Sequence, residues 1–209
     1  MKRYRDRGDT LVEVLFAITV FSLVAVSSIS IMNQGSATEQ RALEITLVRQ
    51  EIDAQAEALR FLNSSYISAY RLGTSNDAGT YNENTPSGQW FKLKDYVKSP
   101  DAISPVNNDS ASCSNKKGSF PQKSFILNAK KAVIVSNAFD RAQTYAQVRY
   151  NNGDVYSSEG IWIEAISPNV TSSSNNTYID FYIRACWDSP GQSVPVRLGT
   201  IVRLYEPRG

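Results

Sequence analysis

The chain has 209 residues, which is enough for one membrane-spanning helix and one globular domain of ordinary size. It contains no histidine, so the commonest general base, the commonest metal ligand and every nucleophile that relies on histidine are excluded. Residues 1–8 carry four basic side chains and one acidic one, and the remainder holds 18 Lys and Arg against 19 Asp and Glu. The bulk of the chain therefore offers no basic field for nucleic acid or anionic lipid.

The first element is an apolar stretch, residues 11–32, that follows the short basic leader. As a helix it would be about 33 Å long, enough to cross the hydrocarbon core of a bilayer. Its only ionisable residue is Glu13. By the positive-inside rule, the basic leader places the amino terminus in the cytoplasm and sends the rest of the chain outward. We expect a single-pass protein of the cytoplasmic membrane with a non-cytoplasmic outer domain.

The order of residues at the start of this stretch differs from that of an ordinary secretion signal, because the small residue Gly8 precedes the apolar run. The segment GDTLVEV, residues 8–14, resembles the prepilin leader of the type IV filament family of pilins, minor pilins and secretion pseudopilins. The resemblance implies that a prepilin peptidase cuts after Gly8 and methylates the new amino group of Asp9. It also implies that Glu13 meets a neighbouring subunit's terminal amine and that the assembled filament is extracellular. The family usually has Phe where this chain has Asp9, which suggests a specialised position in the filament.

Glu13 also has an interpretation that requires no filament. Thr10 and Glu13 have the spacing of a capping box, in which both side chains satisfy the first free amides of a helix. An ionisable group inside an apolar span is costly, however, and is usually functional. The two roles are compatible.

The apolar pattern is interrupted at residues 33–35, and Ser36 and Glu39 form a second capping box. This predicts either a hinge at Gly35 or one helix that becomes polar as it leaves the membrane. Residues 36–62 then predict an amphipathic helix. Its apolar positions are Ile45, Val48, Ile52, Ala56, Leu59 and Leu62. We expect this stripe to pack on a sheet and not to form a coiled coil, because Gln55 interrupts the seam.

The outer part, residues 63–209, starts with turn formers at 73–88 and continues with β patterns. The strands we expect are residues 90–97, 125–127, 132–135, 145–150, 155–158, 161–166, 178–187 and 196–205. The turn at residues 151–154 contains Asn-Gly and predicts a hairpin. A long helix followed by strands, without strand-helix-strand alternation, predicts an α+β class in which the helix packs on an antiparallel sheet, as in pilins.

Two cysteines, Cys113 and Cys186, fall in the outer part, where an oxidising compartment would permit a disulfide. Closing a loop of about 74 residues would stabilise the fold by roughly 4 kcal/mol in the chain-entropy model. The alternative is a pair of buried thiols that never meet.

Other side chains of the outer part are candidates for binding nucleic acid, for hydrolysis or for binding calcium. Five lysines, accompanied by two phenylalanines, could hold a DNA backbone, although a solvated loop is the simpler interpretation. They are Lys116, Lys117, Lys123, Lys130 and Lys131.

Four carboxylates could in principle catalyse acid-pair hydrolysis, but such scattered groups are usually just solvated. They are Glu159, Glu164, Asp180 and Asp188. Residues 107–109 offer calcium too few carboxylates. We expect no enzyme, no cofactor and no metal site.

The leading hypothesis is a structural subunit of a type IV pilus-like filament, a minor or specialised pilin acting in adhesion, motility or uptake. Its segments would be a leader (1–8), a membrane and filament-core helix (9–35), an amphipathic helix (36–62) and an outer β-rich domain (63–209). Its partners would be other pilin subunits, the prepilin peptidase, the assembly machinery and a host or neighbouring cell surface. Two alternatives stay open: a signal-anchored surface binding protein that does not polymerise, and a pseudopilin of a secretion system.

Overall fold

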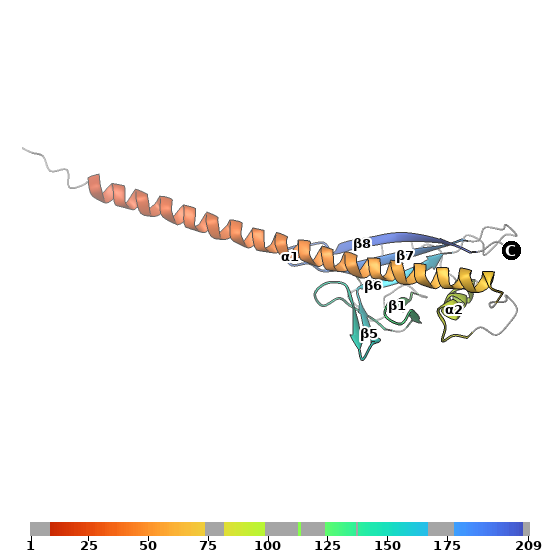
Figure 1. The fold of residues 1–209 in the computed structure, drawn as a ribbon. Helices are drawn as coiled ribbons and strands as arrows, with labels where there is room; N and C mark the ends of the chain where they lie inside the picture. The colour runs from red at the N-terminus through yellow and green to blue at the C-terminus, as the bar shows by residue number, and fades with distance from the viewer. Residues whose placement is uncertain are drawn as a thin grey trace, which may run out of the picture. The chain divides into compact units, whose positions relative to one another are not determined.

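A computed structural model describes residues 9–73, 82–98, 113, 124–136, 138–166 and 178–206. These residues form an α+β fold with a long amino-terminal helix (Figure 1). The helices are α1 (Asp9–Arg71) and α2 (Pro86–Lys98). The strands are β1 (Ile126–Asn128), β2 (Val133–Val135), β3 (Phe139–Asp140), β4 (Gln147–Asn151), β5 (Asp154–Glu159), β6 (Ile161–Ile166), β7 (Tyr178–Trp187) and β8 (Val196–Tyr205).

Helix α1 is continuous for 63 residues. It runs without a break through Gly35 and Ser36, as one helix that becomes polar, and the hinge at Gly35 stays a prediction. The amphipathic part also continues past residue 62, as far as Arg71. Internal contacts divide the chain into two compact units, Met1–Leu43 and Glu44–Gly209, and each is described by itself.

Helix α2 corrects the expectation of a strand at residues 90–97. Thr85 is its N-cap, because the Thr85 hydroxyl accepts the backbone N–H of Gly88 at 3.2 Å, and Pro86 occupies the first helical position, which it favours. Trp90, Leu93 and Val97 are all buried. Their spacing of three and four residues is helical, so the alternation visible in the sequence here was incidental.

The strands form three small sheets, with orders β6-β7-β8, β3-β5-β4 and β1-β2. The two long strands β7 and β8 pair antiparallel over all ten residues of each, and β6 pairs antiparallel with β7. The expected strands at residues 161–166, 178–187 and 196–205 are thereby confirmed. The sheets are not wholly antiparallel, since the two-residue strand β3 runs parallel to β5.

The hairpin between β4 and β5 is confirmed. Asn151 and Asp154 face each other at its end, and the two residues between them, Asn152 and Gly153, have φ angles of 51° and 84°. Positive φ at both central residues is the signature of the turn that suits the twist of paired strands.

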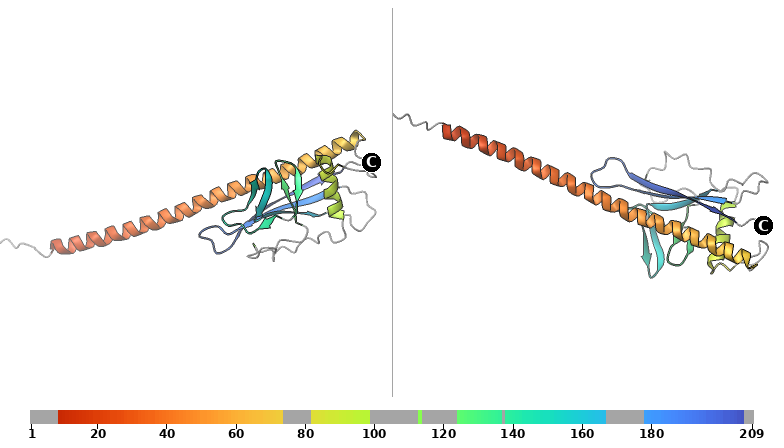
Figure 2. Two further views of the ribbon diagram at one scale, coloured as in Figure 1. Left: turned by 90° about the horizontal axis from the view of Figure 1, so that it is seen from below. Right: turned by 45° about the horizontal axis from the view of Figure 1, so that its top comes forward.

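Within the unit Glu44–Gly209, α1 lies along one face of the β6-β7-β8 sheet (Figures 1 and 2). Five of the six predicted apolar positions of the helix are buried in the core, and Ile45 is partly buried. The alternate residues Ile179, Phe181 and Ile183 of β7 face them. The ring of Phe181 contacts those of Trp90 and Phe125, with centroids 5.7 and 6.4 Å apart, and so joins α2 and the segment before β1 to the same core.

Candidate assembly site

The described residues of the unit Met1–Leu43 are the first part of α1, and its apolar side chains are solvent-exposed there. Phe16 and Phe21, for example, are 71% and 74% exposed. Of the described helices, α1 alone is long and apolar enough to cross a membrane, by length and composition. An apolar surface of this extent needs lipid or protein around it, because exposing it to water is strongly unfavourable.

Four hydroxyl groups in this segment are satisfied inside the helix itself. Thr19, Ser22, Ser27 and Ser28 each donate to a carbonyl oxygen three or four residues earlier, at 2.7–3.1 Å. A hydroxyl bonded in this way does not need water, so these residues can lie in lipid or in a packed helix bundle at low cost.

Glu13 differs from these hydroxyls. Its side chain is exposed on the first turns of α1, and no hydrogen bond or ion pair reaches it from the described residues. Asp9 is both the first described residue and the first residue of α1, so the capping box of Thr10 and Glu13 stays a prediction. Glu13 is thus an ionisable group in an apolar segment, without a partner among the described residues.

The other residues of the predicted processing and hinge sites are placed as follows. Gly8 lies outside the described residues. Asp9 is the first residue of α1. Gly35 is an exposed helical residue, and a Cβ added to it would meet nothing within 4 Å.

The second unit contains a buried carboxylate on α1, next to the predicted apolar stripe. Glu44 is buried, and its Oε2 accepts hydrogen bonds from Trp187 Nε1 at 3.0 Å and from Ser189 Oγ at 2.7 Å. Two donors fix this carboxylate at the end of β7. A helical glutamate four residues before a core valine carries no sequence signal for such a role, because its partners lie more than 140 residues away.

Buried side-chain amides fix the helices to the strand edges. Gln55 is fully buried; its Nε2 donates to Leu127 O at 3.0 Å and its Oε1 accepts from Leu127 N at 2.9 Å, so it pairs with β1 as another strand would. Asn63 donates to the carbonyl of Tyr205 at the end of β8. Gln89 of α2 accepts the N–H of Ile134 in β2. The residue that breaks the apolar seam of the helix is therefore an anchor for the sheet.

A buried lysine joins α2 to α1 and to the residue after β8. Lys94 Nζ lies 3.1 Å from the Tyr66 hydroxyl and 3.3 Å from Glu206 Oε1. Burial by itself would lower the pKa of Lys94, but the Tyr66 hydrogen bond and the Glu206 charge outweigh it, and the pKa is raised above the usual range. The ammonium therefore stays charged and holds the three segments together.

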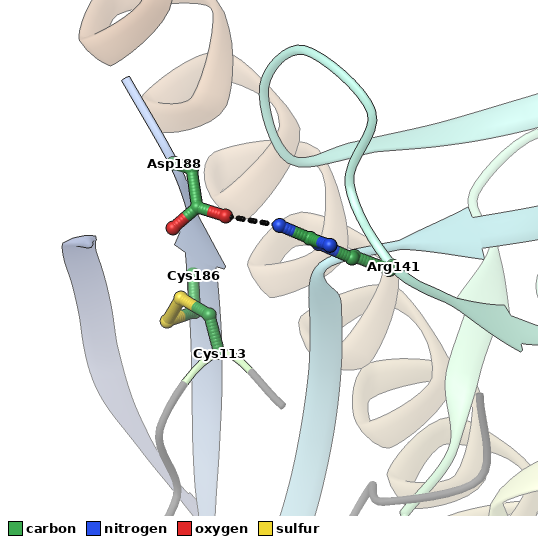
Figure 3. Close-up of a disulfide and its surroundings, with 4 residues drawn as sticks. All are labelled: Cys113, Arg141, Cys186 and Asp188. Carbon is green, nitrogen blue, oxygen red and sulfur yellow. Dashed lines mark hydrogen bonds and ion pairs between the residues drawn. A yellow bond between two sulfur atoms is a disulfide. The ribbon is translucent and has the colours of Figure 1, made fainter. Parts of the chain in front are cut away.

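Cys113 and Cys186 form a disulfide, with Cα atoms 5.3 Å apart (Figure 3). Cys186 lies near the end of β7, so the bond ties Cys113 to the middle strand of the β6-β7-β8 sheet. Arg141 and Asp188 lie beside it and form an ion pair at 2.6 Å, both of them about half exposed. The pair adds little stability because water screens it.

The predicted lysine patch is described only in part. Lys116, Lys117 and Lys123 lie outside the described residues, as do residues 107–109. Lys130 lies over the ring of Tyr150, 4.4 Å from its centroid, and Lys131 pairs with Asp154 at 2.5 Å. These two amines thus already have partners within the chain.

The four carboxylates considered for hydrolysis each have a basic neighbour. Glu159 contacts Arg149 at 2.7 Å, Asp188 contacts Arg141, and Asp180 contacts Arg203 through two bonds of 2.7 Å. Glu164 is fully buried; Trp162 donates to one of its oxygens at 2.7 Å, and Arg184 lies 3.9 Å from the other. Among the described residues, no three His, Cys, Asp or Glu side chains are grouped to hold a metal ion.

Comparisons of the chain with protein-family models, with curated proteins and with solved structures gave no match. The site is therefore interpreted from its residues alone.

Proposed function

We propose that this chain is a structural subunit of a type IV pilus-like filament, held in the cytoplasmic membrane before assembly. In this proposal the fold is pilin-like, the outer domain is non-cytoplasmic and the filament is extracellular. The departure at Asp9 and the large outer domain favour a minor or specialised subunit.

One observation carries the proposal. The first part of α1 presents an exposed apolar surface on which Thr19, Ser22, Ser27 and Ser28 bond to carbonyl groups of the helix itself, and the only carboxylate within residues 11–32 is Glu13, which no described residue binds. Together with Gly8 immediately before the helix, this is the arrangement expected of a subunit that exchanges lipid contacts for contacts with identical helices.

Assembly follows from the energetics of this surface. Lipid covers the apolar side chains while the subunit is in the membrane, and neighbouring helices cover them in the filament. The side chains are therefore shielded from water both before and after extraction. Glu13 would neutralise the terminal amine of a neighbour. A charge without a partner in such a core is strongly unfavourable, and the pair would therefore fix the axial register of the subunits.

The part of α1 from Glu44 onward would carry the outer domain. Glu44, Gln55 and Asn63 bind the two ends and the middle of that domain through buried hydrogen bonds. Because these contacts leave the helix little freedom relative to the sheet, each subunit would present its outer strands and loops as one rigid body. That surface would make the contacts needed for adhesion, motility or uptake.

The test is the intact mass and amino-terminal sequence of the native protein from membranes and from sheared surface material. A chain that begins at Asp9, methylated or not, and is present in the sheared fraction supports the proposal. A chain that begins at Met1 and stays in the membrane would favour a signal-anchored binding protein. A start beyond residue 32 would mean that the apolar segment is removed on secretion, and the proposal would fail.

A pseudopilin shares the leader and the anchor, so this measurement does not separate it from a pilin. The sheared fraction does, because a secretion piston confined to the envelope would be absent from long surface filaments. Immunogold labelling of those filaments with an antibody against the outer domain gives the distinction directly.

A further inference from the structure

Strand β8 is the outer strand of the β6-β7-β8 sheet, and among the described residues it pairs with β7 alone (Figure 2). In the β1-β2 sheet, side-chain amides cap backbone groups of both strands: Gln55 binds β1 and Gln89 binds β2. Over most of its ten residues, β8 has no such cap among the described residues; the exception is Tyr205 at its end, whose C=O accepts a hydrogen bond from Asn63. Such an edge is unusual, because its free N–H and C=O groups invite another strand.

The hydrogen bonds establish which residues of β8 face outward. The backbone N–H of Cys186 donates to Gly160 O at 2.8 Å, on the β6 side, so even-numbered residues of β7 bond toward β6 and odd-numbered residues toward β8. Ile183 is opposite Thr200. Even-numbered residues of β8 therefore complete the pairing with β7, and odd-numbered residues turn their N–H and C=O to the outer edge.

These outward-facing residues are accessible in the middle of the strand. Gly199 is exposed, and because it has no side chain this exposed surface is backbone. Ile201 is 59% exposed. Arg203 could repel another strand by its charge, but Asp180 already neutralises it through two hydrogen bonds of 2.7 Å. The edge thus combines free backbone groups, an apolar side chain and a compensated charge.

We propose that β8 pairs antiparallel with β8 of a second copy of this chain, with Ile201 opposite Ile201 of that copy. In this register the odd-numbered residues of the two strands face each other, as their outward N–H and C=O groups require. Gly199 lies opposite Arg203, and Arg197 opposite Tyr205, whose exposed ring suits a cation.

Contact between the exposed isoleucines selects this register over its neighbours. A shift of two residues toward the start of the strand would set Ile201 opposite Gly199, and a shift toward its end would set Ile201 opposite Arg203, so the contact between the two isoleucines would be lost. In the proposed register no arginine faces another, and the two isoleucines cover each other at the two-fold axis.

The pairing also has a direction. Glu44 of α1 contacts Trp187, which is opposite Val196 at the start of β8, and Asn63 contacts Tyr205 at its end. From Glu44 onward α1 therefore runs with β8, and in the pair the two helices run in opposite directions. Subunits of one polar filament all point the same way, so the contact joins free subunits or subunits of different filaments. The inference does not rest on the proposed function.

The test uses the full chain in detergent micelles. Under mild oxidation, Ile201→Cys is expected to give a dimer linked through residue 201 of both copies, identified by mass spectrometry, because facing residues at this spacing lie within reach of a disulfide. Tyr156→Cys is the matched control: it is 72% exposed on β5 and should stay monomeric. Equal cross-linking of the two variants, or none at residue 201, overturns the proposal.

A charge exchange provides the second test. Ile201→Lys and Ile201→Glu should each raise the dissociation constant of the dimer at least about tenfold, since two like charges then meet at the axis. An equal mixture of the two variants should restore a mixed dimer. A dimer that survives in the lysine variant, or a mixture that fails to associate, overturns the register. The purified Ile201→Cys variant could instead stay monomeric and cross-link to a different protein in native membranes. In that case β8 pairs with that protein, and the proposed pairing with a second copy is wrong.

Discussion

At the scale of single residues, this chain depends on polar groups placed where apolar ones would be expected. Glu13 stands in an apolar span, while Glu44 and Gln55 stand inside a helix–sheet interface. The first was recognisable from the sequence, because an ionisable group among some twenty apolar residues is conspicuous. The other two were not, because their partners, Trp187 and Leu127, are brought to them only by the fold.

Replacing Glu13 with alanine should lower incorporation into filaments while membrane insertion stays unchanged. Removing one member of a buried ion pair costs about 3–5 kcal/mol, so incorporation should fall at least about tenfold. Immunoblots of sheared and membrane fractions measure both quantities. The matched control is Glu39→Ala, an exposed acid on the same helix beyond the apolar segment. Wild-type amounts of the Glu13 variant in the sheared fraction would count decisively against the assembly role.

Replacing Gln55 with leucine should destabilise the outer domain although it adds an apolar side chain to the core. Both backbone groups of the buried Leu127 would lose their partner, at a cost of about 2–4 kcal/mol. Urea unfolding of the full chain in detergent, followed by near-ultraviolet circular dichroism, measures the loss. Gln50→Leu is the control, since Gln50 is exposed on the same helix and should change stability little. Equal stability of the two variants would show that the Gln55 amide is dispensable.

At the scale of elements, the strongest patterns were the most predictable. The alternation in β7 and β8 and the Asn-Gly turn before β5 fixed strand type and pairing correctly, because each is a local consequence of which face is buried. Helix α2 was misassigned because a short apolar segment fits both periods; its Thr-Pro start was the signal that could have decided the matter. Strand β3 has two residues and no pattern to find.

The contact between α1 and the strands beside it should make stability depend on pH through Glu51. Burial raises the pKa of Glu51 above its usual value of 4.5, although the Gln55 hydrogen bond and the Lys130 charge oppose the shift. A carboxyl whose pKa is higher in the folded state contributes stability that is complete below the unfolded pKa and is lost as the pH rises through the folded pKa.

Glu51→Gln should therefore become more stable relative to wild type as the pH rises above about 4.5, and the difference should level off once the folded carboxyl has ionised. The gain should stay under about 1 kcal/mol because the side chain is only half-buried. Unfolding curves between pH 4 and pH 8 measure it. Glu39→Gln, at an exposed position of the same helix, serves as the control. A stability difference for Glu51→Gln that shrinks as the pH rises would contradict the sign.

At the scale of the whole molecule, one covalent bond spans a large part of the outer domain. The disulfide joins residues 73 apart and anchors Cys113 to β7. The sequence made this bond plausible through compartment and cysteine number, but spacing alone could not decide between a bond and two separate thiols. The three-dimensional neighbourhood of the two cysteines was required.

Removing the disulfide with the double substitution Cys113→Ser and Cys186→Ser should lower the free energy of unfolding by about 4 kcal/mol, since the unfolded chain regains the entropy of a long loop. Denaturant unfolding of the oxidised protein, the reduced protein and the double variant measures the effect. The reduced wild type and the variant should agree. If reduction leaves the unfolding midpoint unchanged, the bond does not constrain the unfolded chain.

The contacts of α1 with the last strands set the order in which the protein can mature. Asn63 and Glu44 bind residues that are synthesised more than 140 positions later, and such distant contacts form slowly because a long loop must close first. During synthesis the helix therefore exists before the strands that it binds. Until β8 has been made, the carboxylate and the amides of α1 that are buried in the folded unit lack these partners, and the unit is open to proteases. Completion of the last strand is thus a checkpoint on folding, because the compact unit Glu44–Gly209 cannot form without it.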